Sequence, residues 1–381
     1  MRISSIVSEA LRNIACGTSH AVLMTLAVFI CSSLLGGYEM ASVLTLEQQA
    51  ADRIQADADV TMLVGTTTDG IACDNLAMIA GDKSTAAGIG PSISGALRDG
   101  PQITPNSTPG RDVTSYEVTP GLIRLFAEHE INRIDNGSDK NAPSGTIDTT
   151  GIWIPYDLAN DFGLSVGSRL ETTTGTATVA GVYQWPNDGR DTRLAYAVII
   201  PVSASDGTFD ECWAKQWPIS DDTDRLLYST AIVANGSEQS SAGTTQLNKG
   251  FDSRYDAYDS YRTRMTKWLP IPGLAIGILL GTLSVYRRRL EYAGALHSGQ
   301  TRGAQLLGIA LETAIWAGLG TICTVTVLAA VGYRYSIADP AAITIAAERA
   351  PIAMLSGTMV SAICTGLCVR ESQLFHYFKT R

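Results

Sequence analysis

The chain has 381 residues, of which 45% are hydrophobic and 17% charged, and its formal net charge is −9. So acidic a chain is not expected to bind nucleic acid, because nucleic-acid phosphates attract basic surfaces. It contains no P-loop, G-x-S-x-G or H-E-x-x-H motif, and its four histidines are scattered along the sequence. We therefore expect a non-enzymatic chain with no catalytic, cofactor-binding or metal-binding residues.

Four uncharged apolar runs, at 21–38, 268–286, 313–333 and 350–369, dominate the sequence. Each has about the length that an α-helix needs to cross a bilayer core of ~30 Å at ~1.5 Å per residue. The first run is longer than the ~7–15 residues of a signal-peptide core and continues into helix-compatible sequence, which argues against cleavage. The pattern predicts four membrane-spanning helices in a 1 + 3 arrangement, separated by one large polar segment.

The charge distribution predicts which segments face the cytoplasm. Residues 39–267 hold 31 Asp and Glu against 17 Lys and Arg, a net of −14, whereas 287–305 carry a net of +3. Residues 1–20 carry +1 and residues 370–381 carry +2. Since Lys and Arg are retained on the cytoplasmic side, both termini and the 287–305 segment are predicted to lie there.

The expected fold class is a membrane α-helical protein with a large α+β extracytoplasmic domain inserted between the first and second spans. The predicted segments are a cytoplasmic amphipathic helix (1–20), the first span with the start of a stalk (21–46), the extracytoplasmic α+β domain with its stalk (47–267), the second span (268–286), a cytoplasmic loop (287–305), the third span (306–333), a short extracytoplasmic loop (334–349), the fourth span (350–369) and a cytoplasmic tail (370–381).

Shorter elements are expected within these segments. Apolar residues at helical spacing predict an amphipathic helix over 3–14 that lies flat at the inner membrane surface. Helix-favouring stretches at 39–57 and 256–267 predict stalks that continue the first and second spans. In the external domain we expect strands at 60–64, 113–118, 151–155, 169–174, 177–183, 195–201 and 226–234, helices at 120–134 and 206–217, a solvated acidic turn at 221–224, and polar loops at 65–112, 135–148 and 237–250.

Cysteine usage differs between the two kinds of segment. Of seven cysteines, only Cys73 and Cys212 lie in the external segment, and the other five fall in or beside the apolar runs. Two cysteines alone in an oxidising compartment suggest one disulfide that closes a long loop. The alternative, two buried free thiols, stays open at this point.

The segment after the second apolar run carries the most specific pattern of the chain. It begins Arg287-Arg288-Arg289-Leu-Glu291-Tyr-Ala293 and continues through Gly299 and Arg302 to Glu312, Gly318 and Gly320. This order resembles the FtsX-like and MacB-like permeases, which are the membrane subunits of type VII ABC transporters. Leu296 and His297 depart from that pattern, since the family often has a basic residue and a small residue there.

Part of the external segment is similar to the same family. Residues 152–155 (Ile-Trp-Ile-Pro), 158–170 (with Phe-Gly-Leu-Ser-Val-Gly) and 177–183 (ending Ala-Gly-Val-Tyr) follow the strand, helix and strand of its external core. Ser168 stands where an aspartate is usual. Together with the 1 + 3 plan and the amphipathic helix, the resemblance covers both kinds of segment.

The resemblance implies a permease subunit of an ABC transporter in a bacterial plasma membrane. ATP would be bound by a separate cytoplasmic ATPase subunit, and a second permease subunit would complete a homo- or heterodimer among membrane lipids. ATP-driven motion would be transmitted to the external domain, for export of peptides, lipoproteins or other amphiphiles. The alternatives are an FtsX-type regulator of a cell-wall hydrolase and an ATP-independent membrane receptor or scaffold.

Given this resemblance, the 287–305 segment is the internal segment long enough to hold an ATPase subunit. The candidate coupling residues are Arg287, Arg288, Arg289, Glu291, Gly299 and Arg302. An open alternative for the three consecutive arginines is that they only anchor the topology at anionic headgroups. Glu312 is expected to pair with an arginine of this segment, the alternative being a coupling residue inside the helix bundle.

Overall fold

The computed structural model describes residues 3–17, 19–80, 91–130, 147–232, 242–252 and 255–370. The chain forms two compact units. Unit 1 contains Met1–Ala50 and Tyr258–Arg381, and unit 2 contains Ala51–Ala257. This division separates the apolar helices from the sheet-containing region.

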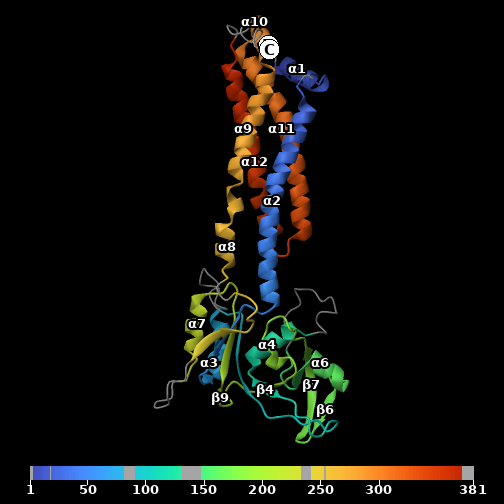
Figure 1. Cartoon of the computed structure of the whole chain (residues 1–381), viewed down its shortest axis with the longest axis vertical. Coiled ribbons are helices and arrows are strands. Elements are labelled where there is room, and N and C mark those ends of the chain that lie inside the picture. The colour runs from blue at the N-terminus through green and yellow to red at the C-terminus, as the bar shows by residue number, and fades with distance from the viewer. Residues whose placement is uncertain are drawn as a thin grey trace. The chain divides into compact units, whose positions relative to one another are not determined.

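The described part of unit 1 is helical (Figure 1). Four stretches are long and apolar enough to span a membrane, as predicted: Ala21–Gln55, Ala257–Arg287, Arg302–Tyr335 and Pro340–Cys368. The helices are α1 (Ile3–Ala15), α2 (Ala21–Gln55), α8 (Ala257–Thr263), α9 (Pro270–Arg287), α10 (Arg289–His297), α11 (Arg302–Tyr335) and α12 (Pro340–Cys368), with a 3₁₀ turn at Met265–Trp268. The last residues of α2, from Ala51 on, belong to unit 2.

Small residues allow α9 and α12 to approach closely. One face of α9 carries Gly273, Gly277 and Gly281, all buried against α12. A Cβ atom at Gly273 would lie 2.9 Å from the carbonyl oxygen of Ala350, so a larger side chain would push the two helices apart. Small residues at the contact are typical of helices that associate in lipid, where apolar burial alone gives little.

Unit 1 places hydroxyl groups inside and apolar side chains outside. The hydroxyls of Ser32 in α2 and Thr324 in α11 lie 2.7 Å apart and are buried. On the outer surface, Val22 is 77% and Leu279 is 69% exposed. This distribution is the one expected for helices surrounded by lipid, where internal polar groups need partners and outward groups do not face water.

The second predicted stalk is not one continuous helix with the second span. α8 ends at Thr263, Arg264 has a ψ of 136°, and α9 begins only at Pro270. Pro270 and Pro272 lack the N–H groups that would bond to the preceding turn. They therefore start a new helix rather than extend the stalk.

Two expected loops of unit 1 are largely helical. Residues Arg289–His297 of the predicted 287–305 loop form α10. In the predicted 334–349 loop, α11 continues to Tyr335 and α12 already begins at Pro340. The Asp339 carboxylate accepts hydrogen bonds from the first backbone amides of α12, and a proline follows it, a combination that starts a helix at this point.

The described part of unit 2 contains a nine-stranded mixed sheet in the order β11-β1-β10-β3-β4-β8-β5-β7-β6. Strands β4 and β8 are parallel, as are β5 and β7. The strands are β1 (Val60–Val64), β3 (Ile93–Asp99), β4 (Ser115–Val118), β5 (Ile152–Pro155), β6 (Arg169–Thr172), β7 (Gly175–Tyr183), β8 (Val198–Pro201), β10 (Glu211–Lys215) and β11 (Gly243–Gln246), with β2 (Thr68–Asp69) and β9 (Thr208–Phe209) in a separate pair. The helices are α3 (Gly70–Ala80), α4 (Pro120–Glu128), α6 (Tyr156–Phe162) and α7 (Asp221–Tyr228), with a 3₁₀ turn at Thr192–Leu194.

Helix α4 contributes most to the largest apolar core of unit 2. The four residues predicted to point inward, Leu122, Ile123, Leu125 and Phe126, are all at most 1% exposed. Their helix lies so close to β3 that a Cβ atom at Gly95 would come within 2.6 Å of the Leu122 Cβ. Gly95 is therefore required by the close approach of helix and strand.

A helix, a strand and a turn predicted for unit 2 are wrong. The predicted helix at 206–217 is β9 and β10, because Cys212 and Ala214 bury one face of β10 while Trp213 buries the other. Residues 226–228 of the predicted strand at 226–234, and all of the predicted solvated turn at 221–224, belong instead to α7, where the Ser220 hydroxyl accepts a hydrogen bond from the backbone amide of Asp222. Acidic residues at a helix N-terminus are favourable, so the acidic run is a helix start.

The predicted loop at 65–112 contains both α3 and β3. Its many small residues were the reason for expecting a loop, yet small residues are what the close contact of β3 with α4 needs. The predicted helix at 120–134 ends at Glu128. Residues 131–146, which include most of the predicted polar loop at 135–148, and residues 233–241 lie outside the described residues. The predicted polar loop at 237–250 is wrong in its described part, because residues 243–246 form β11, which pairs with β1.

Cys73 in α3 and Cys212 in β10 form a disulfide, with their Cα atoms 5.9 Å apart. Both cysteines are fully buried. The alternative of two free thiols does not apply to the structure. The disulfide ties a helix to a central strand across 139 residues of sequence.

Candidate functional site

The 287–305 segment forms a bend followed by a short helix. α9 ends at Arg287, Arg288 stands between the helices, and α10 begins at Arg289. After α10, Gly299 has a φ of +92°, in the left-handed region that favours glycine and commonly ends helices. Gly299 thus terminates α10, so its place in the pattern has a backbone reason.

Arg288 is the residue of this segment that is drawn into the helix bundle. Its Nη1 donates to the Glu312 carboxylate in α11, and its Nε lies 2.8 Å from Oε2 of Glu291. The side chains of Arg288 and Glu312 are only 10% and 7% exposed. Burial lowers the pKa of Arg288, but Tyr292, Glu291 and Glu312 outweigh it and leave that pKa raised. The expected pairing of Glu312 with an arginine of this segment is therefore present.

Helix α1 joins the same ion pair. Asn13 Nδ2 donates to Oε1 of Glu312 over 2.8 Å. Ile6 and Ala10 of α1 are buried, and α1 packs against α11. The expectation that α1 only lies flat at a membrane surface is thus incomplete, because one face of it is held by α11.

A cavity of about 170 Å³ lies beside this cluster. Its walls come from α1, α10, α11 and the turn between α10 and α11. Among the lining residues are Glu9, Asn13, Glu291, Gln300, Gln305 and Glu312. The cavity is therefore polar and carries more carboxylates than cations.

The remaining predicted residues lie on the surface of this segment. Arg287 and Arg302 are exposed, and Arg289 lies 4.3 Å from the ring centre of Tyr286. Arg302 is the first residue of α11, where the helix dipole disfavours a cation. Helix stabilisation therefore does not explain why Arg302 is at this position.

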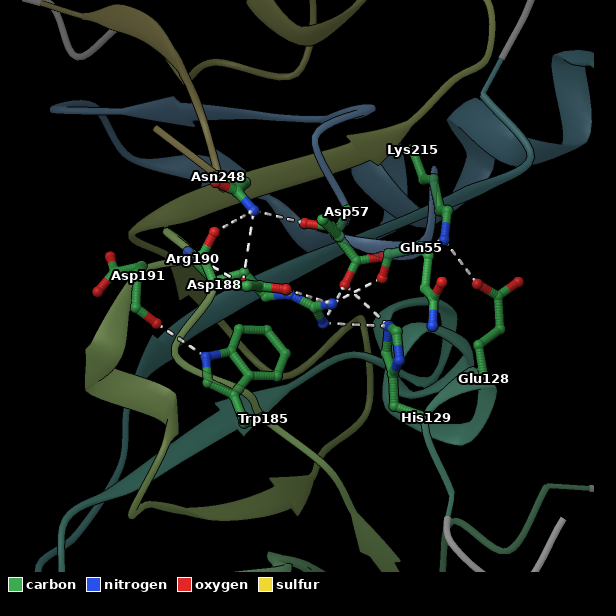
Figure 2. Close-up of polar contacts among 11 residues, drawn as sticks. Gln55, Asp57, Glu128, His129, Trp185, Asp188, Arg190, Asp191, Lys215 and Asn248 are labelled. Carbon is green, nitrogen blue, oxygen red and sulfur yellow. Dashed lines mark hydrogen bonds and ion pairs between the residues drawn. The ribbon is translucent and has the colours of Figure 1, made fainter. Parts of the chain in front are cut away.

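A second polar cluster, which the sequence did not predict, is centred on Asp57 in unit 2. Figure 2 shows its carboxylate between three basic side chains. Arg190 Nη1 and His129 Nε2 lie 2.7 and 2.8 Å from Asp57 Oδ2, and Lys215 Nζ lies 3.1 Å from Oδ1. Asp57 is 0% exposed. Its charge is therefore fully compensated by partners rather than by water.

The carboxyl groups of this cluster titrate differently. Burial raises the pKa of Asp57, but the hydrogen bond and charge of His129, with Lys215 and Arg190, outweigh it and lower that pKa. For Asp59, burial is opposed by Lys215 and reinforced by Asp57, and the pKa rises to about 7. Burial lowers the pKa of Lys215, yet Asp57, Asp59 and Glu128 leave it raised.

One feature of the sequence could have indicated this cluster. Asp57 and Asp59 directly precede the apolar strand β1, and two carboxylates so close to a buried strand need partners. Those partners come from residues 128–248 and no spacing in the sequence connects them. The signal could have indicated a buried ionic cluster, but not its members.

No protein-family model and no curated protein matches this chain. Its similarity to the FtsX-like and MacB-like permeases therefore depends on the motifs quoted from the sequence.

Proposed function

We propose that the chain is the permease subunit of an ABC transporter of the FtsX-like/MacB-like type. One observation carries the proposal: Arg288, at the base of α10, is tied by ion pairing to Glu312 of α11, and through Glu312 to Asn13 of α1. A helix presented between two spans and anchored to a third element is suited to pass an applied displacement on to the spans.

The proposed mechanism is mechanical. A cytoplasmic ATPase subunit binds α10 and the start of α11 through the exposed side chains of Glu291, which lines the cavity, and Arg302. Closure of the ATPase subunits on ATP moves α10, and the buried Arg288–Glu312 pair transmits this movement to α11 because a desolvated ion pair resists separation. A second permease subunit completes the transporter.

The proposed location is a bacterial plasma membrane, with α1, α10 and the C-terminal tail in the cytoplasm and unit 2 outside. The net charges of +3 for 287–305 and −14 for 39–267 support this orientation. Unit 2 then acts on cargo at the outer face, with peptides, lipoproteins or other amphiphiles as the proposed class.

The test is a double substitution, Glu291→Ala with Arg302→Ala, in an affinity-tagged full-length chain. We expect a P-loop ATPase to co-purify with the unaltered chain and its recovery to fall about tenfold or more with the variant, because two charged contacts are removed. A matched control, Glu348→Ala with Arg349→Ala, removes one charge of each sign from α12 and should leave recovery unchanged.

Peptide mass spectrometry identifies the ATPase, and the ATPase activity of the reconstituted complex measures coupling. Equal recovery and equal turnover in the double variant would move the interface away from α10. Absence of any ATPase from the unaltered chain would contradict the permease proposal and favour a receptor or scaffold.

A further inference from the structure

The C-terminal end of α2, which belongs to unit 2, is held by side chains of the same unit. Its last residue, Gln55, offers a carbonyl oxygen to Arg190 Nη2 over 2.7 Å. The carbonyl of the next residue, Ala56, accepts a hydrogen bond of 2.8 Å from Asn248 Nδ2. Carbonyl groups at a helix end have no partners within the helix, and here a cation and an amide supply them.

Asp57 adds the strongest contact at the same point. Arg190 donates hydrogen bonds to both the Gln55 carbonyl and the Asp57 carboxylate, so one guanidinium group makes two contacts at the helix end (Figure 2). Asp57 has a φ of +50°, a left-handed conformation that a non-glycine residue adopts only when its surroundings hold it there. The chain is thus fixed in direction as well as position where it leaves α2.

The residues that contact the end of α2 come from the sheet and from segments beside it. Lys215 ends β10, Asn248 follows β11, and β1 lies between β10 and β11 in the sheet. Arg190 is 5% exposed, and its guanidinium also bonds Asp188 and lies 5.5 Å from the Trp185 ring centre. A load on the end of α2 would therefore act on three adjacent strands at once.

The segment that follows β11 contacts the last turn of α2. Arg53, in the last turn of α2, lies 3.7 Å from the ring centre of Tyr255 and 5.3 Å from that of Phe251. Tyr255 in turn stacks on Trp217. The helix end thus contacts the segment that precedes α8 as well as Arg190 and Asn248.

We propose that Asp57, Arg190 and Asn248 form a coupling site that makes the end of α2 and the strands β11, β1 and β10 move as one body. The inference rests on the proposed function, since it names the residues through which displacement of a span would reach unit 2. The buried charges suit this purpose better than apolar contact, because charge-assisted hydrogen bonds are directional and resist sliding.

The first experiment needs no ATPase. Hydrogen exchange is measured by mass spectrometry on the full-length chain in lipid nanodiscs, for Arg190→Lys and, separately, for Asn248→Asp. Lysine keeps the charge of Arg190 but cannot donate from two guanidinium nitrogens at once. Aspartate keeps the shape of Asn248 but lacks its amide N–H donor. We expect amides of residues 51–58 to exchange about tenfold faster in each variant, while β3 keeps the exchange of the unaltered chain.

The matched control is Arg193→Lys. Arg193 lies three residues from Arg190 and also makes a two-pronged ion pair, with Glu211, but it does not bond the end of α2. Exchange of 51–58 should stay unchanged in this control. If 51–58 exchanged rapidly in the unaltered chain, or equally in Arg190→Lys, Asn248→Asp and the control, the coupling site would be refuted. Faster hydrogen exchange throughout β3 would show that the variant is destabilised as a whole, and it would also refute a local coupling site.

A second experiment uses the complex with the co-purified ATPase. In the unaltered complex, vanadate trapping of ATP should change the exchange of β3 and β4, and in Arg190→Lys this change should fall at least several-fold while ATPase binding persists. An undiminished response in Arg190→Lys would overturn the coupling site alone. Failure of the unaltered chain to bind any ATPase would overturn the proposed function. The first experiment would still test the coupling site, because it does not depend on the ATPase.

Discussion

The guanidinium of Arg264 lies 2.8 Å from Oε1 of Glu39, although 225 residues separate them in sequence. Their side chains are 6% and 5% exposed. Arg264 stands where the helical stretch between α8 and α9 is interrupted, and it also lies 3.8 Å from the Tyr261 ring centre. The pair therefore fixes that interruption against the middle of α2.

Removing one member of this pair should destabilise unit 1. Glu39→Gln leaves the Arg264 charge buried without its counter-charge, and we expect a loss of about 3–5 kcal/mol in the free energy of unfolding. Thermal unfolding of the full-length chain in detergent, followed by circular dichroism, measures the change.

Adding Arg264→Gln to Glu39→Gln should restore part of that loss, because the unpaired charge is then gone. Glu117→Gln, which affects the more exposed pair with Arg98, serves as the control and should cost less. A loss in Glu39→Gln no larger than in this control would contradict a structural role for the Arg264–Glu39 pair.

The proposed orientation predicts unequal access to two engineered thiols. In a chain whose free cysteines (Cys16, Cys31, Cys323, Cys364 and Cys368) are changed to serine, Ser107→Cys should react with an impermeant maleimide in intact cells, and Ser298→Cys should not. Both serines are exposed on their own units, so burial does not explain a difference. Ser298→Cys should become reactive once the membrane is opened with detergent, and reaction of both in intact cells would refute the orientation.

The disulfide should contribute strongly to the stability of unit 2. It closes a loop across 139 residues, for which the chain-entropy model gives about 4–5 kcal/mol. Cys73→Ser with Cys212→Ser should lower the stability of unit 2 by roughly that amount, and the exposed Cys364→Ser should not. Mass spectrometry of non-reduced peptides should recover the two cysteines cross-linked, and recovery of both as free thiols would contradict the disulfide.

Asp59 predicts a pH dependence of unit 2. Its pKa of about 7 in the folded chain exceeds the ordinary 3.8, so between these values the folded state holds a proton that the unfolded state has lost. The free energy of unfolding should therefore fall as pH rises from about 4 to 7, by on the order of a few kcal/mol. The charges facing Asp59 are Lys215, Asp57 and Glu128, and they are retained in the variant Asp59→Asn.

Urea unfolding of the full-length chain, read by pulsed hydrogen exchange of β1 and β10, measures this dependence. Asp59→Asn should remove most of the slope between pH 4 and 7, and the 67% exposed Asp206→Asn should leave it unchanged. An identical slope in Asp59→Asn would assign the dependence to other groups. Below about pH 4 the lowered pKa of Asp57 acts in the opposite direction, since protonation of that carboxylate removes stability.

Parts of the fold could be predicted from the sequence where a local sequence pattern indicates them. The four long helices follow from uncharged runs, because lipid imposes a length and excludes charge. Pairing of Glu312 with an arginine of the 287–305 segment was also predicted, because Glu312 lies near the end of its span, but the sequence did not show that the arginine is Arg288. By contrast, β10 is only five residues long and is buried on both faces, so its alternation could not be distinguished from a short helix.

The cluster around Asp57 was not predicted from the sequence, for a different reason. Its polar contacts join the end of α2 and Asp57 to residues 129–248, and the positions of Arg190 and Asn248 follow only from the completed sheet. The same holds for Glu39 and Arg264, which the second span brings together. Sequence showed that these charges exist, but their neighbours are decided by tertiary structure.

The strand order has a consequence for biogenesis. In the proposed orientation unit 2 crosses the membrane N-terminal end first, yet β10 lies between β1 and β3, which precede it by more than a hundred residues. Until residues 211–215 have been translocated, β1 and β3 lack the strand that pairs with both, Cys73 stays a free thiol and Asp57 lacks its contact with Lys215. Completion of unit 2 is thus a late event of export, and a chain arrested before residue 211 would present to quality-control proteases the unpaired edges of β1 and β3 and an unpaired cysteine.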